Sequence, residues 1–153
     1  MTGADIMVKC LEAEGVDTIF GYPGVAIAPF FNSVLASDIR SVLVRTEQSA
    51  GHAASGAART TGKVGVCVAT SGPGATNLLT GIATAYADSI PLVCITGQVK
   101  TELIGRDVFQ EADVTGAAES FVKYSYLVKH VEDLPRVFKE AFYIAAQAAV
   151  VRY

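Results

Sequence analysis

Helical and extended patterns alternate along the chain. Capping signals, helical apolar spacing and runs of small residues predict helices at 2–15, 27–35, 48–59 and 75–88. Short apolar runs between them predict strands at 17–20, 41–45, 63–70 and 91–96. Thr2 and Asp5 have the spacing of a capping box, and Gly15 is placed to end the first helix.

Strands that are apolar on both faces and separated by helices are typical of a parallel sheet covered on two sides. We therefore predict a single α/β domain over residues 1–153, a parallel sheet with helices on both faces. A more exposed strand is expected at 122–128, where apolar and polar residues alternate. A last amphipathic helix is expected from Leu134, led by Glu132 and Asp133 at its positive end.

Composition narrows the class of protein. The chain has 153 residues, 51% of them hydrophobic and 18% charged, which is enough to bury a core. A formal net charge of −3 gives no basic patch, so we expect no nucleic-acid partner. No apolar run approaches the roughly 20 residues of a membrane helix, and we expect neither membrane contact nor a targeting peptide. Cys10, Cys67 and Cys94 are widely spaced in apolar settings, which favours reduced, buried thiols in a cytoplasmic protein over a disulfide or metal site.

Three unusual sequences follow the expected strands: GYPG at 21–24, RTEQ at 45–48 and TSGPGATN at 70–77. Ligands of open parallel sheets bind beyond the carboxyl ends of the strands, so we expect the site at this edge. The loop at 71–77 could approach a ligand at a helix N-terminus. It matches neither a Walker A sequence nor a G-x-G-x-x-G fingerprint, and a plain turn that needs glycine dihedrals explains it equally well.

Glu47 lies between an expected buried strand and a helix of small residues. Buried without an ionic partner, its carboxyl could donate a hydrogen bond or shuttle a proton. An ion pair with Arg45 or Arg59, or a favourable place at a helix N-terminus, is the simpler interpretation from the residues alone.

Other chemical groups give weaker signals. His52 and His130 have no metal-ligand partner at the right spacing, and Ser71 lacks a nucleophile elbow, so we assign no metal site and no serine hydrolase. The alanines and glycines of 50–58 allow close approach of another backbone, either within the monomer or at a subunit interface beside Glu47.

Six motifs occur in order along the chain: GYPG, R-x-E-Q, TSGPGATN, ADSIPLVCITGQV, FQEAD and LVKHVEDLPRVFKEAF. Together they resemble the N-terminal, pyrimidine-binding domain of thiamine-diphosphate enzymes, and most nearly the acetolactate (acetohydroxyacid) synthase family. The resemblance runs from about residue 2 to residue 146. Any one motif is weak, but the ordered set is specific.

The resemblance implies roles for particular residues. Glu47 would hydrogen-bond N1′ of the cofactor's aminopyrimidine and promote the imino tautomer, whose 4′-nitrogen takes the proton from thiazolium C2. The family's reaction would then condense two 2-oxo acids, such as pyruvate, with loss of CO2. The residues around the pyrimidine would be Pro23, Thr70, Pro73, Gly74 and Asn77, and those on the substrate side would be Val25, Phe109 and Gln110.

Three features depart from the family pattern. Thr46 stands where these synthases usually have the histidine of an Arg-His-Glu motif, and Val25 where they typically carry a second glycine. Both leave the reaction and the acceptor open. Residues 146–153 do not show the Gly-Arg-Pro-Gly-Pro-Val-Leu-type turn and final strand expected after the last helix.

The resemblance also implies partners. Family members hold the diphosphate and Mg²⁺ with a Gly-Asp-Gly sequence in a separate domain and carry a middle domain for FAD; no Gly-Asp-Gly occurs here. We therefore expect the isolated chain to be inactive. It would work as a homodimer or higher homo-oligomer through the small-residue helix, with a diphosphate-binding domain of the same or another chain. The alternatives are another thiamine-diphosphate enzyme (a 2-oxo acid decarboxylase or a sulfoacetaldehyde acetyltransferase) and a non-catalytic association domain.

Overall fold

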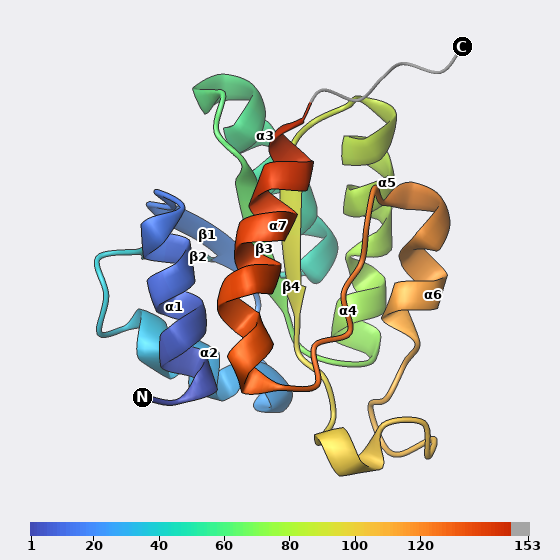
Figure 1. Ribbon diagram of the computed structural model, residues 1–153. Helices are drawn as coiled ribbons and strands as arrows, with labels where there is room; N and C mark the ends of the chain where they lie inside the picture. Colours follow the sequence, from blue (N-terminus) through green and yellow to red (C-terminus); the bar gives the residue numbers. More distant parts are fainter. Residues whose placement is uncertain (148–153) are drawn as a thin grey trace.

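Four parallel strands form the central sheet of the computed structural model, which describes residues 1–147. In sheet order they are β2 (Arg40–Leu43), β1 (Thr18–Gly21), β3 (Gly65–Ala69) and β4 (Leu92–Thr96), as Figure 1 shows. Each neighbouring pair is parallel. The predicted fold class and the first four predicted strands are confirmed.

Helices cover both faces of the sheet (Figure 1). On one face, α1 (Gly3–Ala13) packs against α2 (Ala28–Val34) and α7 (Leu134–Ala146). On the other, α3 (Glu47–Thr61) packs against α5 (Leu79–Ala87), beside the short α4 (Pro73–Asn77) and α6 (Val114–Ala118). Single 3₁₀ turns lie at η1 (Val25–Ile27), η2 (Thr101–Leu103), η3 (Glu119–Phe121) and η4 (Val131–Asp133).

β3 shows why the sheet needs apolar residues at every position. All of its residues are buried. Val66 and Val68 join the core formed with α1, α2 and α7, whereas Cys67 and Ala69 join the core formed with α3 and α5. Because successive side chains of a strand point to opposite faces, a strand between two helical layers has no solvent-facing position.

The start and end of α1 are as predicted. The Thr2 hydroxyl accepts a hydrogen bond from the Asp5 N–H (3.2 Å), and the Asp5 carboxylate accepts one from the Thr2 N–H (2.7 Å). Gly15 has the positive φ (73°) that ends the helix. The Ser33 hydroxyl of α2 also donates to Asp5 (2.7 Å). The Thr2 backbone N–H and the Ser33 hydroxyl lower the pKa of Asp5 to about 2.

β2 is less buried than predicted. Arg40, Ser41 and Leu43 are exposed, and Leu43 keeps 69% of its accessible surface. Among the described residues β2 pairs only with β1, so it is an edge strand. An apolar sequence alone does not distinguish a central strand from an edge strand whose side chains are covered by another part of the protein.

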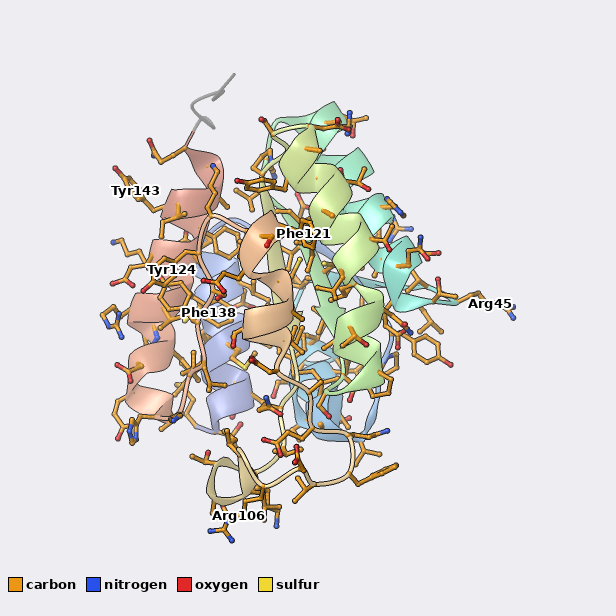
Figure 2. The ribbon with its side chains drawn as sticks, turned by 90° about the vertical axis from the view of Figure 1, so that its right-hand side faces the viewer. Arg45, Arg106, Phe121, Tyr124, Phe138 and Tyr143 are labelled. Carbon is orange, nitrogen blue, oxygen red and sulfur yellow. The ribbon has the colours of Figure 1, made fainter. Side chains whose placement is uncertain are left out.

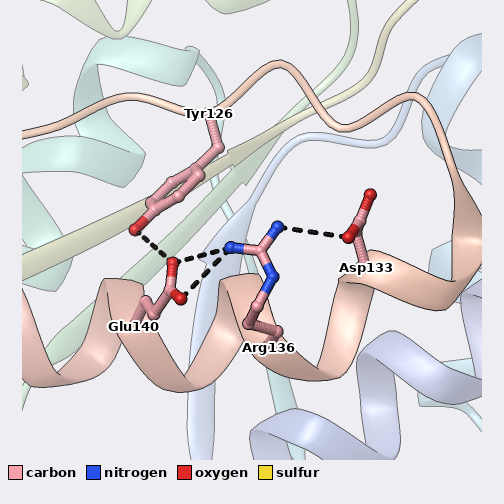
Figure 3. Close-up of polar contacts among 4 residues, drawn as sticks. All are labelled: Tyr126, Asp133, Arg136 and Glu140. Atoms are coloured by element: carbon pink, nitrogen blue, oxygen red, sulfur yellow. Dashed lines mark hydrogen bonds and ion pairs between the residues drawn. The ribbon is translucent and has the colours of Figure 1, made fainter.

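The strand predicted at 122–128 is wrong: these residues form no strand in the described structure. They run alongside α7 instead. The Tyr126 hydroxyl donates to Glu140 Oε2 of α7 (3.0 Å), and Arg136 bridges Glu140 and Asp133 (Figure 3). The prediction from alternating polarity was wrong because a segment forms a strand only where its backbone can hydrogen-bond to the edge of another strand.

The remaining helices follow the predictions with small differences. The helix expected at 75–88 begins at Pro73 and is interrupted at Leu78, between α4 and α5. The predicted amphipathicity of α7 is confirmed, since Phe138 is buried and Tyr143 is 67% exposed (Figure 2). The departure noted at 146–153 lies outside the described residues, apart from its first two. Among residues 1–147, no helix has the length and apolar character needed to cross a membrane.

Candidate functional site

The segments that follow all four strands meet at one edge of the sheet, as predicted for the first three. The turn after β1 reaches the end of β3, because the Tyr22 N–H donates to Val68 O (3.2 Å). Gly97, just after β4, packs closely on the same region. A Cβ added to it would lie 3.1 Å from the Ser71 nitrogen and 3.3 Å from Ala26 Cβ. Gly97 was not among the predicted site residues, and only its position after a strand could have suggested it.

Glu47 is the first residue of α3. Thr46 caps this helix, its hydroxyl accepting the Ser49 N–H at 3.3 Å. Threonine is a favourable N-cap, so the position before Glu47 has a local structural role. Glu47 is half-buried in the single chain.

The ion pairs considered for Glu47 are not formed among the described residues. Arg59 pairs with Asp88. Arg45 points away from the domain into solvent (Figure 2). The helix N-terminal interpretation holds, because Glu47 is the acidic residue in the first turn of α3.

Asn77 is the hydrogen-bond partner of Glu47. Its side-chain amide, at the end of α4, donates to Glu47 Oε2 at 3.0 Å. Among residues 1–147, no hydrogen bond to Glu47 Oε1 is formed. The carboxylate is therefore oriented through one oxygen while the other faces the turn after β3.

Thr70 lies at the centre of this cluster. A Cβ added to Gly24 would lie 2.5 Å from Thr70 Cβ, and one added to Gly74 would lie 2.6 Å from Thr70 Cγ2 and 3.1 Å from Glu47 Oε1. Glycine at both positions thus lets the turns after β1 and β3 approach Thr70 closely. Thr70 Oγ1 is buried with no hydrogen-bond partner among the described residues, and such an orphaned hydroxyl suggests a ligand or water beside it.

Gln110 contacts the same region through its backbone. Gly72 has φ +59°, and a Cβ there would lie 2.6 Å from the Gln110 carbonyl oxygen. Gln110 itself has φ +62°. Because L side chains rarely adopt this region, the FQEAD segment and the turn after β3 meet at two constrained positions.

The other predicted site residues lie at the same edge of the sheet but take no part in the contacts around Glu47 and Thr70. Val25 and Phe109 are each 88% exposed, and Pro23 and Pro73 are exposed as well. The structure therefore brings together Glu47, Thr70, Gly74 and Asn77, with the Gln110 backbone nearby.

Glu111 was missed by the sequence interpretation. Its carboxylate accepts hydrogen bonds from the backbone N–H groups of Gly105 and, at 3.2 Å, Val108. These bonds lower the pKa of Glu111, with the Gly105 N–H as the main cause. Glu111 fixes the loop that carries Phe109 and Gln110 and has Arg106 at its tip (Figure 2). No local spacing rule predicts a carboxylate that binds amides up to six residues back.

Comparison with known proteins extends these observations. Residues 1–117 match the family model described as thiamine pyrophosphate enzyme, N-terminal TPP binding domain. The chain is 55% identical over 145 residues to the probable acetolactate synthase large subunit of Methanocaldococcus jannaschii, an alignment that covers 95% of this chain and 24% of that protein.

Two bacterial relatives have similar sequence identity to this chain. The acetolactate synthase large subunit IlvB1 of Mycobacterium tuberculosis is 56% identical over 147 residues, covering 95% of this chain and 24% of that protein. The acetolactate synthase isozyme 2 large subunit of Escherichia coli is 54% identical over 145 residues, covering 95% and 26%. The chain thus spans about a quarter of the length of these curated relatives.

Proposed function

This chain belongs to the thiamine pyrophosphate enzyme family, as its N-terminal TPP-binding domain, and we propose that it supplies the aminopyrimidine-binding part of an acetolactate synthase. The observation that carries the proposal is the carboxylate of Glu47, held by Asn77 beside Gly74 and Thr70. The complete enzyme would condense two molecules of 2-oxo acid with loss of CO2.

The residues present fit an aminopyrimidine. Such a ring needs a carboxyl partner for a ring nitrogen, polar groups at its edge and close backbone approach to its faces. Glu47 Oε1 and the orphaned Thr70 hydroxyl supply the polar partners, and Gly24 and Gly74 supply backbone without side-chain bulk. Pro23, Pro73 and Asn77 lie around them in the proposed site.

The cofactor, when bound, supplies a thiazolium whose C2 carbon can be deprotonated. In our proposal, the Glu47 carboxyl would hydrogen-bond N1′ of the ring and exchange a proton there, and the Asn77 amide would keep that carboxyl oriented. A neighbouring domain that covers the half-buried carboxylate would strengthen the bond by excluding water.

The substrate side is assigned to the exposed residues at the same edge. Val25 and Phe109 are available to a second surface because little of this chain covers them. Together with Gln110, we propose that they face the 2-oxo acid. Glu111 would position Phe109 and Gln110 through its hold on the loop backbone.

The proposal also assigns partners. The exposed edge of β2 and the outer face of α3 would pack against a second copy of the protein. The diphosphate, Mg²⁺ and FAD would be held by parts of the protein that this chain does not contain. We further propose that the enzyme works in the cytoplasm.

A product assay on the full-length protein tests the proposal. Pyruvate and thiamine diphosphate should give acetolactate, and omission of the cofactor should abolish it. Acetaldehyde as the main product would favour a 2-oxo acid decarboxylase, an alternative that Thr46 and Val25 leave open. No thiamine-dependent turnover of any 2-oxo acid or of sulfoacetaldehyde would favour a non-catalytic association domain.

A further inference from the structure

Two cysteines of adjacent strands face each other in the sheet. Cys67 of β3 and Cys94 of β4 are directly paired in the parallel register. The two strands lie side by side in Figure 1. The Cys67 thiol donates to Cys94 Sγ at 3.2 Å, and all three cysteines of the chain are free thiols.

The register is compatible with a covalent bond between the two sulfurs. Neighbouring strands are about 4.8 Å apart, and disulfides join Cα atoms that are about 4.4–6.8 Å apart. Both side chains belong to the same apolar cluster and therefore point to the same face of the sheet. Bond formation needs only side-chain rotation and a small closing movement.

The two thiols differ in access. Cys67 is completely buried. Cys94 is half-buried and lines a cavity of about 980 Å³ bordered by β4, α5, α6, α7 and residues 122–131. The hydrogen bond to Cys94, followed by burial, raises the pKa of Cys67. Cys94 is therefore the sulfur that a small reagent meets first.

We propose that Cys67 and Cys94 form a cross-strand dithiol that hydroperoxides oxidise to a disulfide joining β3 to β4. Cys94 sulfur attacks the peroxide oxygen and becomes a sulfenic acid, and the other peroxide oxygen leaves as alcohol or water. Cys67 sulfur then attacks Cys94 sulfur and expels hydroxide, which takes the Cys67 proton and leaves as water. The two thiols lose two electrons, and the peroxide gains them.

The cross-link would close a loop that contains the turn after β3, α4 and α5. Asn77, Gly74 and Pro73 lie in that loop. The cross-link would therefore restrain a loop that carries residues of the proposed cofactor site. The oxidation itself does not depend on the proposed function.

Peptide mass spectrometry of the full-length protein tests this directly. The native protein is treated with hydrogen peroxide and then unfolded in denaturant that contains iodoacetamide, which alkylates free thiols. The protein is then digested with trypsin. No lysine or arginine lies between Lys63 and Lys100, so both cysteines fall in the 64–100 peptide. We expect this peptide to be lighter by two hydrogen atoms and unalkylated. Cleavage before Asp88, its only aspartate, should leave two fragments joined until they are reduced.

Two cysteine variants test whether the cross-link joins Cys67 to Cys94. Cys10→Ala removes the third cysteine and should leave the cross-link unchanged. Cys67→Ala should abolish it and leave Cys94 alkylated or oxygenated. The proposal is overturned if the wild-type peptide is alkylated at both cysteines, if Cys94 gains oxygen while Cys67 stays alkylatable, or if the link runs to Cys10.

Discussion

The side-chain amide of Asn77 donates a 3.0 Å hydrogen bond to Oε2 of Glu47. The two residues belong to different helices, α4 and α3, and are thirty positions apart in the chain. The bond fixes the carboxylate so that Oε1 lies beside Gly74. The orientation of Glu47 therefore depends on the turn after β3 as well as on its own helix.

Removing the Asn77 amide should weaken this orientation. A hydrogen bond to a charged group contributes about 1.5–3 kcal/mol, so Asn77→Ala should lower turnover by about 10- to 100-fold if the carboxylate acts in catalysis. Asn77→Asp should be worse, because two carboxylates would then face each other. Steady-state kinetics of the full-length enzyme measure both effects.

Thr76→Ala is the matched control for Asn77. The Thr76 hydroxyl bonds only the Pro73 carbonyl of its own helix among the described residues. Turnover within a factor of about two of the wild type is expected, since surface changes away from special features usually stay within about 0.5 kcal/mol. Equal losses in the Thr76 and Asn77 variants would contradict a specific role for the amide.

A methyl group at Gly74 should disturb the site. In Gly74→Ala, the new Cβ would lie 2.6 Å from Thr70 Cγ2 and 3.1 Å from Glu47 Oε1. Overpacking of this kind costs about 1–3 kcal/mol. We expect a lower melting temperature and a higher KM for thiamine diphosphate.

A double variant separates the steric effect from other causes. Thr70→Ser removes the methyl group that clashes but keeps Oγ1. In Gly74→Ala with Thr70→Ser, part of the lost stability and cofactor affinity should return. Strictly additive losses in this double-mutant cycle would show that the Gly74–Thr70 contact is not the cause.

Stability at acidic pH should depend on Asp5. Its pKa is about 2 in the folded protein and about 3.9 in an unfolded chain. A depressed folded pKa stabilises the folded state fully above the unfolded value, and this contribution disappears as the pH falls through the folded value. Asp5→Asn should therefore flatten the fall in stability between about pH 4 and pH 2. Denaturant unfolding across this range measures the slope, and Asp38→Asn, at an exposed site, should leave it unchanged.

Val25 offers a test of acceptor choice. Its side chain is 88% exposed at the edge proposed to face the substrate. Val25→Gly removes a β-branched group there and should broaden or accelerate use of the second 2-oxo acid. Competition between two acceptors in one reaction mixture measures the change, and an unaltered product ratio would count against crowding by Val25.

Much of the fold could be predicted because local patterns and packing agree. β3 is apolar at every position because helices cover both of its faces, and α1 has its cap and its terminating glycine at the predicted places. The strand predicted at 122–128 was wrong and the exposure of β2 was not predicted, for a shared reason. Pairing and cover depend on distant segments, which alternation and apolarity do not encode.

The position of the site and four of its residues could be predicted from the sequence, but other features of the site could not. Its edge followed from the parallel sheet, and the resemblance named Glu47, Thr70, Gly74 and Asn77, which the structure brings together. The loop-fixing role of Glu111 did not follow, because it depends on how the chain turns between 105 and 111. Two of those positions, Asp107 and Gln110, have positive φ without being glycine, so sequence rules give no signal there.

Proton exchange at the thiazolium C2 of bound thiamine diphosphate tests the central claim most directly. Glu47→Gln keeps the side-chain volume but removes the carboxyl that we propose exchanges a proton with the pyrimidine. Positioned acid–base groups contribute about 10²- to 10⁴-fold, and we predict a loss of hydrogen–deuterium exchange of that size in the full-length variant with the cofactor bound. Exchange at the wild-type rate in that variant would contradict the assignment of Glu47.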